Sequence, residues 1–304
     1  MTDLAWAGHD IPTFVLGTAQ LGSSYGIANA LGQPTDAGAT EIVKTAWASG
    51  VRCFDTAQAY GSEHVLGDAL TKLGLADDAK IVTKLSPDLD PTNLSDIEQA
   101  VYASLTRLQV SGVWGLMSHR YSWLSVWDQG LGDCLKAIRA SGKVSHLGVS
   151  VYTCQEAISA LNHPDIEMIQ LPSNVWDPRM KQAGIFDLAR KKGKLCFVRS
   201  LYLQGLVLMD AKEGATRLPA AREALDAWAQ ASDALGRSKK ELAIQYALSL
   251  GVPLVIGAET ATQVAETSHL ISTLSPLSDA DLLALTDKVS PHLTDRVLNP
   301  AAWS

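Results

Sequence analysis

Eight short, almost continuously apolar segments recur along the chain, and helix-forming sequence separates each from the next. Such segments are typical of parallel strands that are covered on both faces, because strands with one wet face alternate apolar and polar residues. The segments are TFVLGT (13–18), VRCFDTA (51–57), KIVTKL (80–85), VWGLMSH (113–119), VSHLGVSV (144–151), IEMIQLP (166–172), KLCFVRS (194–200) and PLVIGA (253–258). Eight strands alternating with helices predict an α/β protein with a (β/α)₈ TIM barrel, a fold that typically takes about 250 residues.

A doubly wound open sheet is the rival fold. It usually carries a GxGxxG fingerprint after its first strand, and GTAQLGSSYG (17–26) does not match that pattern. The barrel is therefore favoured. No linker or shift in composition divides the 304 residues, so we expect a single domain over 1–304.

Helix boundaries are marked between the strands. SDIE (95–98) and TCQE (153–156) have the form of capping boxes, in which a hydroxyl and a carboxylate satisfy free N–H groups at a helix start. Gly142 and Gly193 are placed to close two helices. The long connection before the eighth strand predicts an extra helix in LPAAREALDAWAQASDAL (218–235).

Composition and net charge exclude several classes of binding partner and cellular location. The net charge of −7, without a block of Lys or Arg, argues against nucleic acid. The four cysteines form no CxxC pair, which argues against a metal site and against disulfides, and Cys53 and Cys196 are expected in the core. No apolar stretch reaches the roughly 20 residues of a membrane span. The first ten residues lack a signal-peptide pattern, so we expect a cytoplasmic protein with a small-molecule substrate.

Polar side chains stand where the predicted strands end, and in a barrel the chemistry lies at those ends. They are Asp55 with Tyr60 on the following loop, Lys84, His119, Ser150, Gln170, Arg199 and Ser200. Taken singly, Asp55 could cap a turn, Lys84 could bind a backbone carbonyl, and His119 could be a core histidine. Their shared position at one barrel mouth favours a catalytic function.

These residue types suit acid–base catalysis on an oxygen. A phenol has an ordinary pKa of about 10, and a nearby ammonium lowers that value by stabilising the phenolate. We expect Asp55 to keep Lys84 charged and aimed at Tyr60, and His119 to hydrogen-bond the reacting oxygen. This set suits proton transfer coupled to hydride transfer, and the hydride must come from a cofactor.

Several ordered motifs resemble the aldo-keto reductase superfamily over about residues 13 to 275. They are FDTAQAYGSEHVLGDAL, IVTKL, GLMSH, GKVSHLGVSVYT, MIQLPSN and VIGAETATQVAET. The resemblance implies a (β/α)₈ barrel that binds NAD(P)(H) without a Rossmann fold. It also places the family's catalytic tetrad on Asp55, Tyr60, Lys84 and His119, with the tyrosine as general acid in reduction and base in oxidation.

The resemblance further implies a set of cofactor contacts. Ser150 and Gln170 would hold the nicotinamide carboxamide, Val151 replaces a common Asn, and Arg199 stands where an aromatic residue often stacks on the nicotinamide. The full expected set is Gly17, Thr18, Ser150, Gln170, Arg199, Ser200, Leu201, Gln204, Gly205, Gly257, Glu259, Gln263 and Glu266.

The segment IGAETATQVAET (256–267) bears on the choice between NAD(H) and NADP(H). Thr260 and Gln263 form another capping-box pattern, and family members that prefer NADP place Lys or Arg on this stretch. Here Gly257, Glu259 and Gln263 provide no cation. A glutamate would repel a 2′-phosphate and could accept a hydrogen bond from a ribose hydroxyl, so we expect NAD(H) to be used at least as well as NADP(H). Alternatively, Glu259 only stabilises the positive helix end.

Substrate contacts are predicted from the loops at the same mouth. Tyr25, Arg120, Trp123 and Trp176 are the candidates, although each could equally pack against neighbouring loops. The mixture suits an aldose, aldehyde or polyol, and GTAQLGSSYGIAN and RSLYLQGLVL resemble a bacterial branch with sugar-related reductases and dehydrogenases. Two other functions stay open: a cofactor-binding barrel that acts as a sensor or partner subunit, and a different barrel enzyme such as an isomerase or lyase.

Overall fold

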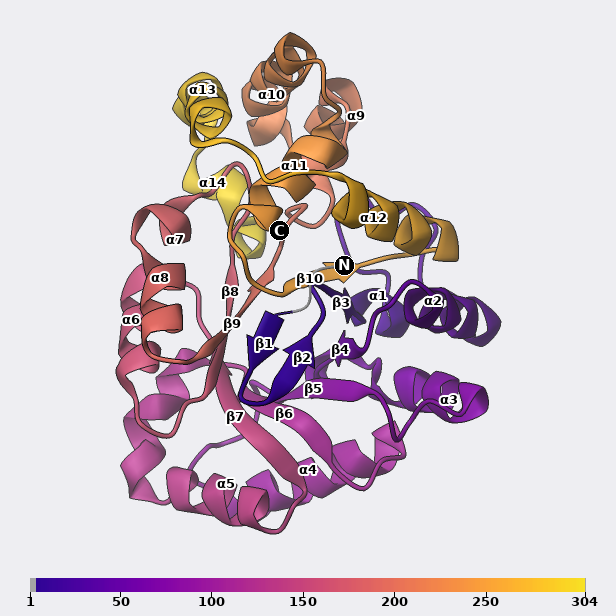
Figure 1. Ribbon diagram of the computed structural model, residues 1–304, viewed down its shortest axis with the longest axis vertical. Coiled ribbons are helices and arrows are strands. Elements are labelled where there is room, and N and C mark those ends of the chain that lie inside the picture. The colour runs from indigo at the N-terminus through magenta and orange to yellow at the C-terminus, as the bar shows by residue number, and fades with distance from the viewer. Residues whose placement is uncertain (1–3, 304) are drawn as a thin grey trace.

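The computed structural model describes residues 4–303, and its centre is a closed barrel of parallel strands in the order β10-β3-β4-β5-β6-β7-β8-β9 (Figure 1). The strands are β3 (Phe14–Gly17), β4 (Cys53–Asp55), β5 (Lys80–Leu85), β6 (Val113–Ser118), β7 (Val144–Ser150), β8 (Met168–Pro172), β9 (Leu195–Arg199) and β10 (Leu254–Gly257). Each lies within one of the eight apolar segments, so the predicted (β/α)₈ TIM barrel is confirmed and the open sheet is excluded.

Helices cover the outside of the barrel. They are α1 (Ala19–Gly22), α2 (Asp36–Ala48), α3 (Glu63–Leu73), α4 (Leu94–Leu108), α5 (Leu131–Ala140), α6 (Cys154–Asn162), α7 (Arg179–Gln182), α8 (Ile185–Lys191), α9 (Ala211–Arg217), α10 (Arg222–Leu235), α11 (Lys239–Leu248), α12 (Ala261–Thr273), α13 (Asp279–Val289) and α14 (Asp295–Leu298). Short 3₁₀ helices join them: η1 (Gln58–Tyr60), η2 (Tyr121–Gln129), η3 (Leu206–Leu208), η4 (Pro219–Ala221), η5 (Ser290–His292) and η6 (Pro300–Ala302). The extra helix expected over 218–235 is present as α10.

The helix starts confirm one predicted capping box and correct another. Thr153 and Glu156 cap α6 reciprocally, as expected. The SDIE segment is not a capping box, because α4 begins at Leu94 and the Asn93 side chain caps it by accepting the Asp96 N–H. An amide oxygen one residue before the helix thus replaces the Ser95 hydroxyl.

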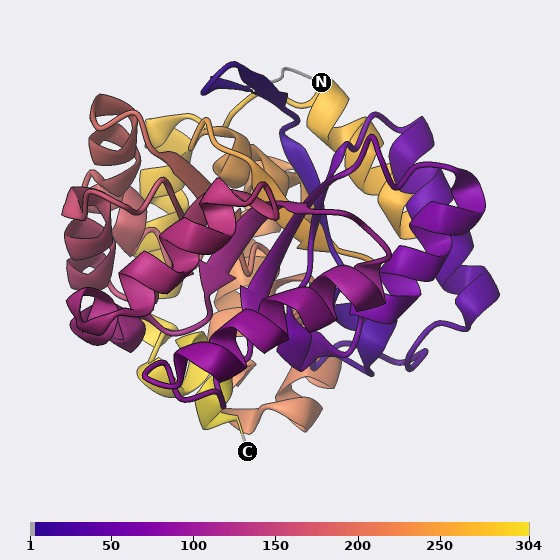
Figure 2. The same cartoon turned by 90° about the horizontal axis from the view of Figure 1, so that it is seen from below.

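A short hairpin that the apolar pattern did not predict lies across one end of the barrel. It consists of antiparallel strands β1 (Leu4–Trp6) and β2 (His9–Ile11). Leu4 and Trp6 pack on the residues that fill the barrel interior, among them Val15, Val82, Trp114, Met168 and Phe197. Figures 1 and 2 show the hairpin at the end where the strands begin, and Figure 2 shows the C-terminus at the opposite end.

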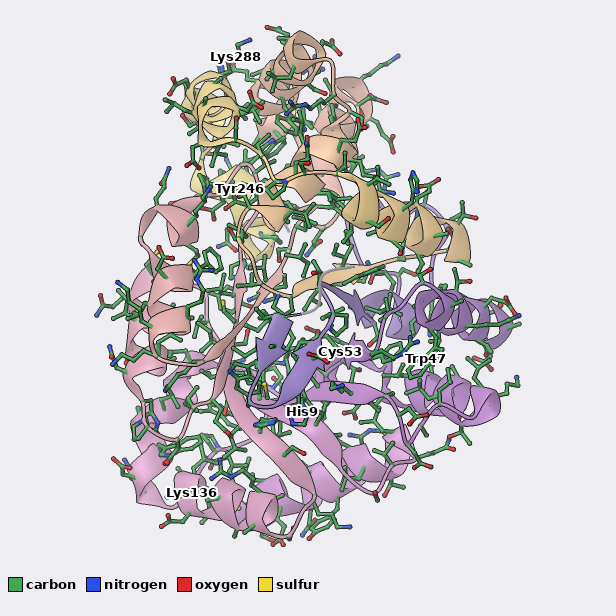
Figure 3. All side chains as sticks on the ribbon, in the orientation of Figure 1. His9, Trp47, Cys53, Lys136, Tyr246 and Lys288 are labelled. Atoms are coloured by element: carbon green, nitrogen blue, oxygen red, sulfur yellow. The ribbon has the colours of Figure 1, made fainter. Side chains whose placement is uncertain are left out.

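The second apolar layer lies between the strands and the helices. Phe14, Leu16, Phe54 and Leu66 are at most 1% exposed and belong to this layer. Cys53 and Cys196 are buried, as predicted, and the described cysteines are free thiols. In Figure 3 Cys53 lies within the ring of strands, whereas Lys136 on α5 and Lys288 on α13 lie at the outside. Among residues 4–303, no helix is both long and apolar enough to cross a membrane.

Candidate active site

Asp55 and Lys84 form a buried ion pair where neighbouring strands β4 and β5 approach their carboxyl ends. Lys84 Nζ lies 2.6 Å from Asp55 Oδ1 and 2.8 Å from Oδ2, and it also donates to the Thr56 carbonyl at 3.1 Å. Both side chains are at most 5% exposed. Burial lowers the pKa of Lys84, and the Asp55 carboxylate opposes that shift. The carboxylate therefore compensates the ammonium that burial disfavours.

Tyr60 lies above this pair, at the end of the single-turn helix η1. Lys84 Nζ is 5.2 Å from the centre of the Tyr60 ring. Gln58, in the same turn, fixes its position: its Nε2 donates to the Ala100 carbonyl at 2.9 Å and to Ser104 Oγ at 2.8 Å, and its Oε1 accepts the Ser86 N–H at 2.8 Å. Thus η1 is tied both to helix α4 and to the segment that follows β5.

The pKa of Tyr60 is raised above its ordinary value, which corrects the expectation that Lys84 lowers it. Burial is the largest cause, the Asp55 charge adds to it, and only the Arg199 guanidinium opposes it. The physical reason is that burial disfavours the charged phenolate, and the negative charge of Asp55 disfavours it further. Tyr60 is consequently a phenol that keeps its proton at neutral pH, as a general acid requires.

His119 follows β6 and completes the group. Its ring meets the Tyr60 ring edge to face, with centres 5.9 Å apart and an interplanar angle of 88°. Burial, together with the charges of Lys84 and Arg199, lowers the pKa of His119 to about 4. The imidazole is therefore neutral near pH 7, and its buried Nδ1 has no hydrogen-bond partner within the described residues. The structure thus brings Asp55, Tyr60, Lys84 and His119 together.

A cleft of about 460 Å³ begins at Asp55 and Tyr60 and extends along the mouth toward helix α12. All but two of the expected cofactor residues line this cleft. Those that line it are Gly17, Thr18, Arg199, Ser200, Leu201, Gln204, Gly205, Gly257, Glu259, Gln263 and Glu266. Ser150 and Gln170, the exceptions, face each other on β7 and β8 and are at most 1% exposed. They lie beneath the inner end of the cleft, because Gln170 Nε2 donates to Asp55 Oδ1 at 2.7 Å.

Two features of the cleft fit a dinucleotide. The turn after β9 has left-handed backbone at Ser200 (φ 62°), Leu203 (φ 47°), Gln204 (φ 55°) and Gly205 (φ 93°). Such conformations at non-glycine residues are costly, and turns of this kind can form concave sites for anions such as pyrophosphate. The buried Gln170 Oε1 has no partner within residues 4–303, so it is available to accept from an amide N–H₂.

The start of α12 differs in detail from the expected capping box. Thr260 accepts the Gln263 N–H, but the Gln263 side chain accepts from Glu259 N–H, at 2.8 Å, instead of from Thr260. Burial raises the pKa of Glu259. Gly257, Glu259 and Gln263 provide no cation, as noted, yet Lys240 of α11 reaches the same end of the cleft and pairs with Glu266 at 3.0 Å. No local sequence signal links Lys240 to this site.

The four expected substrate contacts separate into two groups. Tyr25 lines the cleft and is 39% exposed, and Arg120 is exposed next to His119 but does not line the cleft. Trp123 and Trp176 are each 3% exposed and belong to the apolar core, where Trp176 packs edge to face on Trp228. Their placement corrects the expectation that they form a pocket wall, because burial of these large rings in the core leaves them no open face.

One aromatic residue at the mouth was missed. Tyr152 is 57% exposed, and the Arg199 guanidinium lies over its ring at 4.4 Å. This contact holds Arg199 beside the inner end of the cleft, since cations are attracted to aromatic faces. Tyr152 lies two residues after Ser150, the last residue of β7. This position next to a strand end is the sequence signal that could have identified Tyr152 as a residue of the barrel mouth.

Comparison with known proteins agrees with this architecture. The model of the aldo/keto reductase family matches residues 13–289. The glycerol dehydrogenase AKR11B4 from Gluconobacter oxydans is structurally similar, with a TM-score of 0.74, 20% identity and coverage of 98% of this chain and 97% of that chain. The aldo-keto reductase AKR11C1 from Bacillus halodurans, in its holo form, gives a TM-score of 0.76 at 19% identity, covering 98% of each chain. None of the curated proteins compared with the chain matches it.

Proposed function

Because the chain belongs to the aldo/keto reductase family, we propose that Asp55, Tyr60, Lys84 and His119 are the residues that perform its chemistry. The protein is an NAD(P)-dependent oxidoreductase that acts on carbonyl and hydroxyl groups, as members of this family are. The proposal concerns which side chains move the proton, which cofactor is preferred and which substrates are taken.

The observation that carries the proposal is the convergence of these four side chains at the inner end of the cleft. Tyr60 is the general acid in carbonyl reduction, and burial keeps its proton in place until the substrate oxygen becomes basic. The neutral His119 ring, 5.9 Å from the Tyr60 ring, donates a hydrogen bond that orients the same oxygen. Lys84 stabilises the phenolate that forms when Tyr60 gives up its proton, and Asp55 holds Lys84 in place.

The nicotinamide cofactor supplies or accepts the hydride. Gln170 Oε1 is the acceptor proposed for the carboxamide. The turn over 200–205 is proposed to bind the pyrophosphate with backbone N–H groups other than those of Leu203 and Gly205, which donate to carbonyls within the turn. Gly205 is required there for two reasons: its φ is 93°, and a Cβ on it would overlap the side chain of Ala28. Arg199, held over Tyr152, lies where it can contact the cofactor ring from one side.

We further propose that NAD(H) is used at least as well as NADP(H). The outer end of the cleft contains Glu213, Glu259 and Glu266, whereas its described cation, Lys240, is already paired. A 2′-phosphate carries nearly two negative charges at neutral pH, so these carboxylates would repel it. The catalytic efficiencies with the two cofactors test this point, and a hundredfold preference for NADPH would contradict it.

The proposed substrates are small hydroxylated carbonyl compounds and alcohols, namely aldoses, aldehydes and polyols of carbohydrate metabolism. Support comes from the mouth, where Tyr25, Tyr152 and Arg120 present hydroxyl and guanidinium groups instead of an apolar surface. The likeness to a protein described as a glycerol dehydrogenase is in keeping with a polyol. We propose a single-domain, cytoplasmic enzyme, since the described cysteines are all free thiols, as a reducing compartment would maintain them.

A panel of aldoses, aldehydes and polyols, assayed with all four nicotinamide forms, tests the proposed function. The expected result is turnover, followed by the change in nicotinamide absorbance, for at least one hydroxylated compound. Turnover should be lost in the Tyr60→Phe variant while cofactor binding is retained. A variant that still turns over its substrate at the wild-type rate would exclude Tyr60 as the proton donor.

A further inference from the structure

Lys240 and Glu266 form an ion pair across the outer end of the cleft. Lys240 lies in the first turn of α11 and Glu266 in α12, with Nζ and Oε2 3.0 Å apart. The Lys240 side chain is 23% exposed and the Glu266 side chain 58% exposed. Both side chains line the cleft that begins at Tyr60. The pair therefore joins α11 and α12 within the lining of the cleft.

The charges along the cleft differ from one end to the other. Among the described lining residues the cations are Arg199 and Lys240, and Arg199 belongs to the inner end, beside Tyr60. The outer end has three carboxylates, of which Glu213 pairs with Arg217 at 3.1 Å and Glu266 pairs with Lys240. Lys240 is thus the cation at that end to which a phosphate could bind, and a carboxylate of the protein already occupies it.

We propose that the Lys240–Glu266 pair determines cofactor specificity, with Glu266 withholding from a 2′-phosphate the lysine that would otherwise bind it. This inference rests on the proposed function, because it assumes that the adenosine half of the cofactor occupies the outer end of the cleft. In the paired state Lys240 offers no free charge to a 2′-phosphate, whereas a ribose with a 2′-hydroxyl needs none. When Glu266 is neutral, Lys240 becomes free to bind a phosphate dianion through a charge-assisted hydrogen bond.

Binding of two probes without a nicotinamide ring tests this proposal separately from catalysis. Isothermal titration calorimetry would compare ADP-ribose with 2′-phospho-ADP-ribose on the wild type, Glu266→Gln, Lys240→Met and the double variant. Glu266→Gln should tighten binding of 2′-phospho-ADP-ribose by about tenfold or more and change the affinity for ADP-ribose by less than about threefold. The double variant should lose this gain, and the gain should shrink as salt is added.

Glu213→Gln is the matched control, because it removes the same charge from the same end of the cleft and leaves the Lys240–Glu266 pair intact. An equal gain in this variant would assign the effect to net charge and overturn the proposal. So would a gain that persists in the double variant, or equal changes for both probes. If neither probe binds any of these proteins, although thermal unfolding shows that they are folded, the cofactor site itself is wrong and the inference fails with it.

A gain confined to Glu266→Gln and abolished by Lys240→Met would support the proposal and show that the proposed cofactor site is in the right place. The experiment therefore distinguishes failure of the specificity proposal from failure of the proposed cofactor site. Binding of ADP-ribose without a selective gain rejects only the specificity pair, whereas loss of all binding rejects the site. Because both side chains are partly exposed, the substitutions should leave the unfolding temperature nearly unchanged.

Discussion

The Lys84 ammonium nitrogen lies 5.2 Å from the centre of the Tyr60 ring, and the same nitrogen is within 2.8 Å of both oxygens of Asp55. The ammonium is thus closer to its counter-ion than to the centre of the Tyr60 ring. In the resting protein Tyr60 stays protonated, since burial and then the Asp55 charge raise the pKa of the phenol. The phenolate is stabilised only at short range, when the proton has moved to the substrate.

Tyr60→Phe should lower kcat about a hundredfold to ten-thousandfold, because it removes the proposed proton donor and leaves the ring in place. The dissociation constant for the cofactor, measured by fluorescence, should change little. Tyr102→Phe on α4 is the control, since Tyr102 is 42% exposed and does not line the cleft. Equal activity in the two variants would exclude the proposed role.

The stability of the protein should fall as the pH drops from 6.5 to about 4, and His119 should account for part of the fall. Its pKa is about 4 in the folded protein and 6.5 as the ordinary value, so the unfolded chain binds the proton first. Protons therefore favour unfolding in that window, by up to about 3 kcal/mol for one group. Urea unfolding of wild type and His119→Asn at pH 7 and pH 4.5 measures the difference. An unchanged pH dependence in the variant would contradict this assignment.

Asp55→Asn should destabilise the protein by about 3 kcal/mol, because it leaves a buried lysine without its counter-ion. Glu41→Gln is a suitable comparison, as the Lys44–Glu41 pair is 59% exposed on both sides and should contribute less than about 1 kcal/mol. The double variant Asp55→Asn/Lys84→Met should recover part of the lost stability while remaining inactive. Denaturant midpoints measure all three. If the single and double variants unfold alike, burial of the charge is not the cause.

Gln58→Leu should lower kcat about a hundredfold and alter KM little, because three hydrogen bonds that position η1 are lost and a displacement near 1 Å is enough for such an effect. Gln58 does not itself reach the reacting atoms in this interpretation. Gln99→Leu, on the exposed face of α4, is the matched control. The opposite pattern, a raised KM with an unchanged kcat, would show that Gln58 acts on binding and not on the position of Tyr60.

The strands could be predicted from sequence because the apolar pattern that marks each strand is a local property of the chain. A strand covered on both faces needs mostly apolar residues, and segments such as KIVTKL or VWGLMSH have that composition. The pattern can be recognised without knowing the rest of the chain. The residues at the strand ends followed from the same argument, since parallel strands in a barrel end at one mouth. For that reason Asp55, Lys84 and His119 could be placed together before any contact was known.

Local rules were less successful where two signals competed. Asn93 and Ser95 are both good caps, and the helix starts at the first of them, so SDIE was misread. Trp123 and Trp176 follow strand ends and thus met the rule for pocket residues, but their large apolar area is buried against the core. The hairpin over the barrel end was missed because three-residue strands carry almost no pattern.

The sequence alone determined the barrel, its eight strands and the identity of the four polar residues at its mouth, because period and position along a strand encode them. Only the tertiary structure decided the direction of the shift in the Tyr60 pKa, which depends first on the burial of the phenol and then on the nearby Asp55 charge. It also brought Lys240 to Glu266, residues of different helices. Electrostatic effects vary with distance and burial in three dimensions, and a linear sequence contains neither quantity.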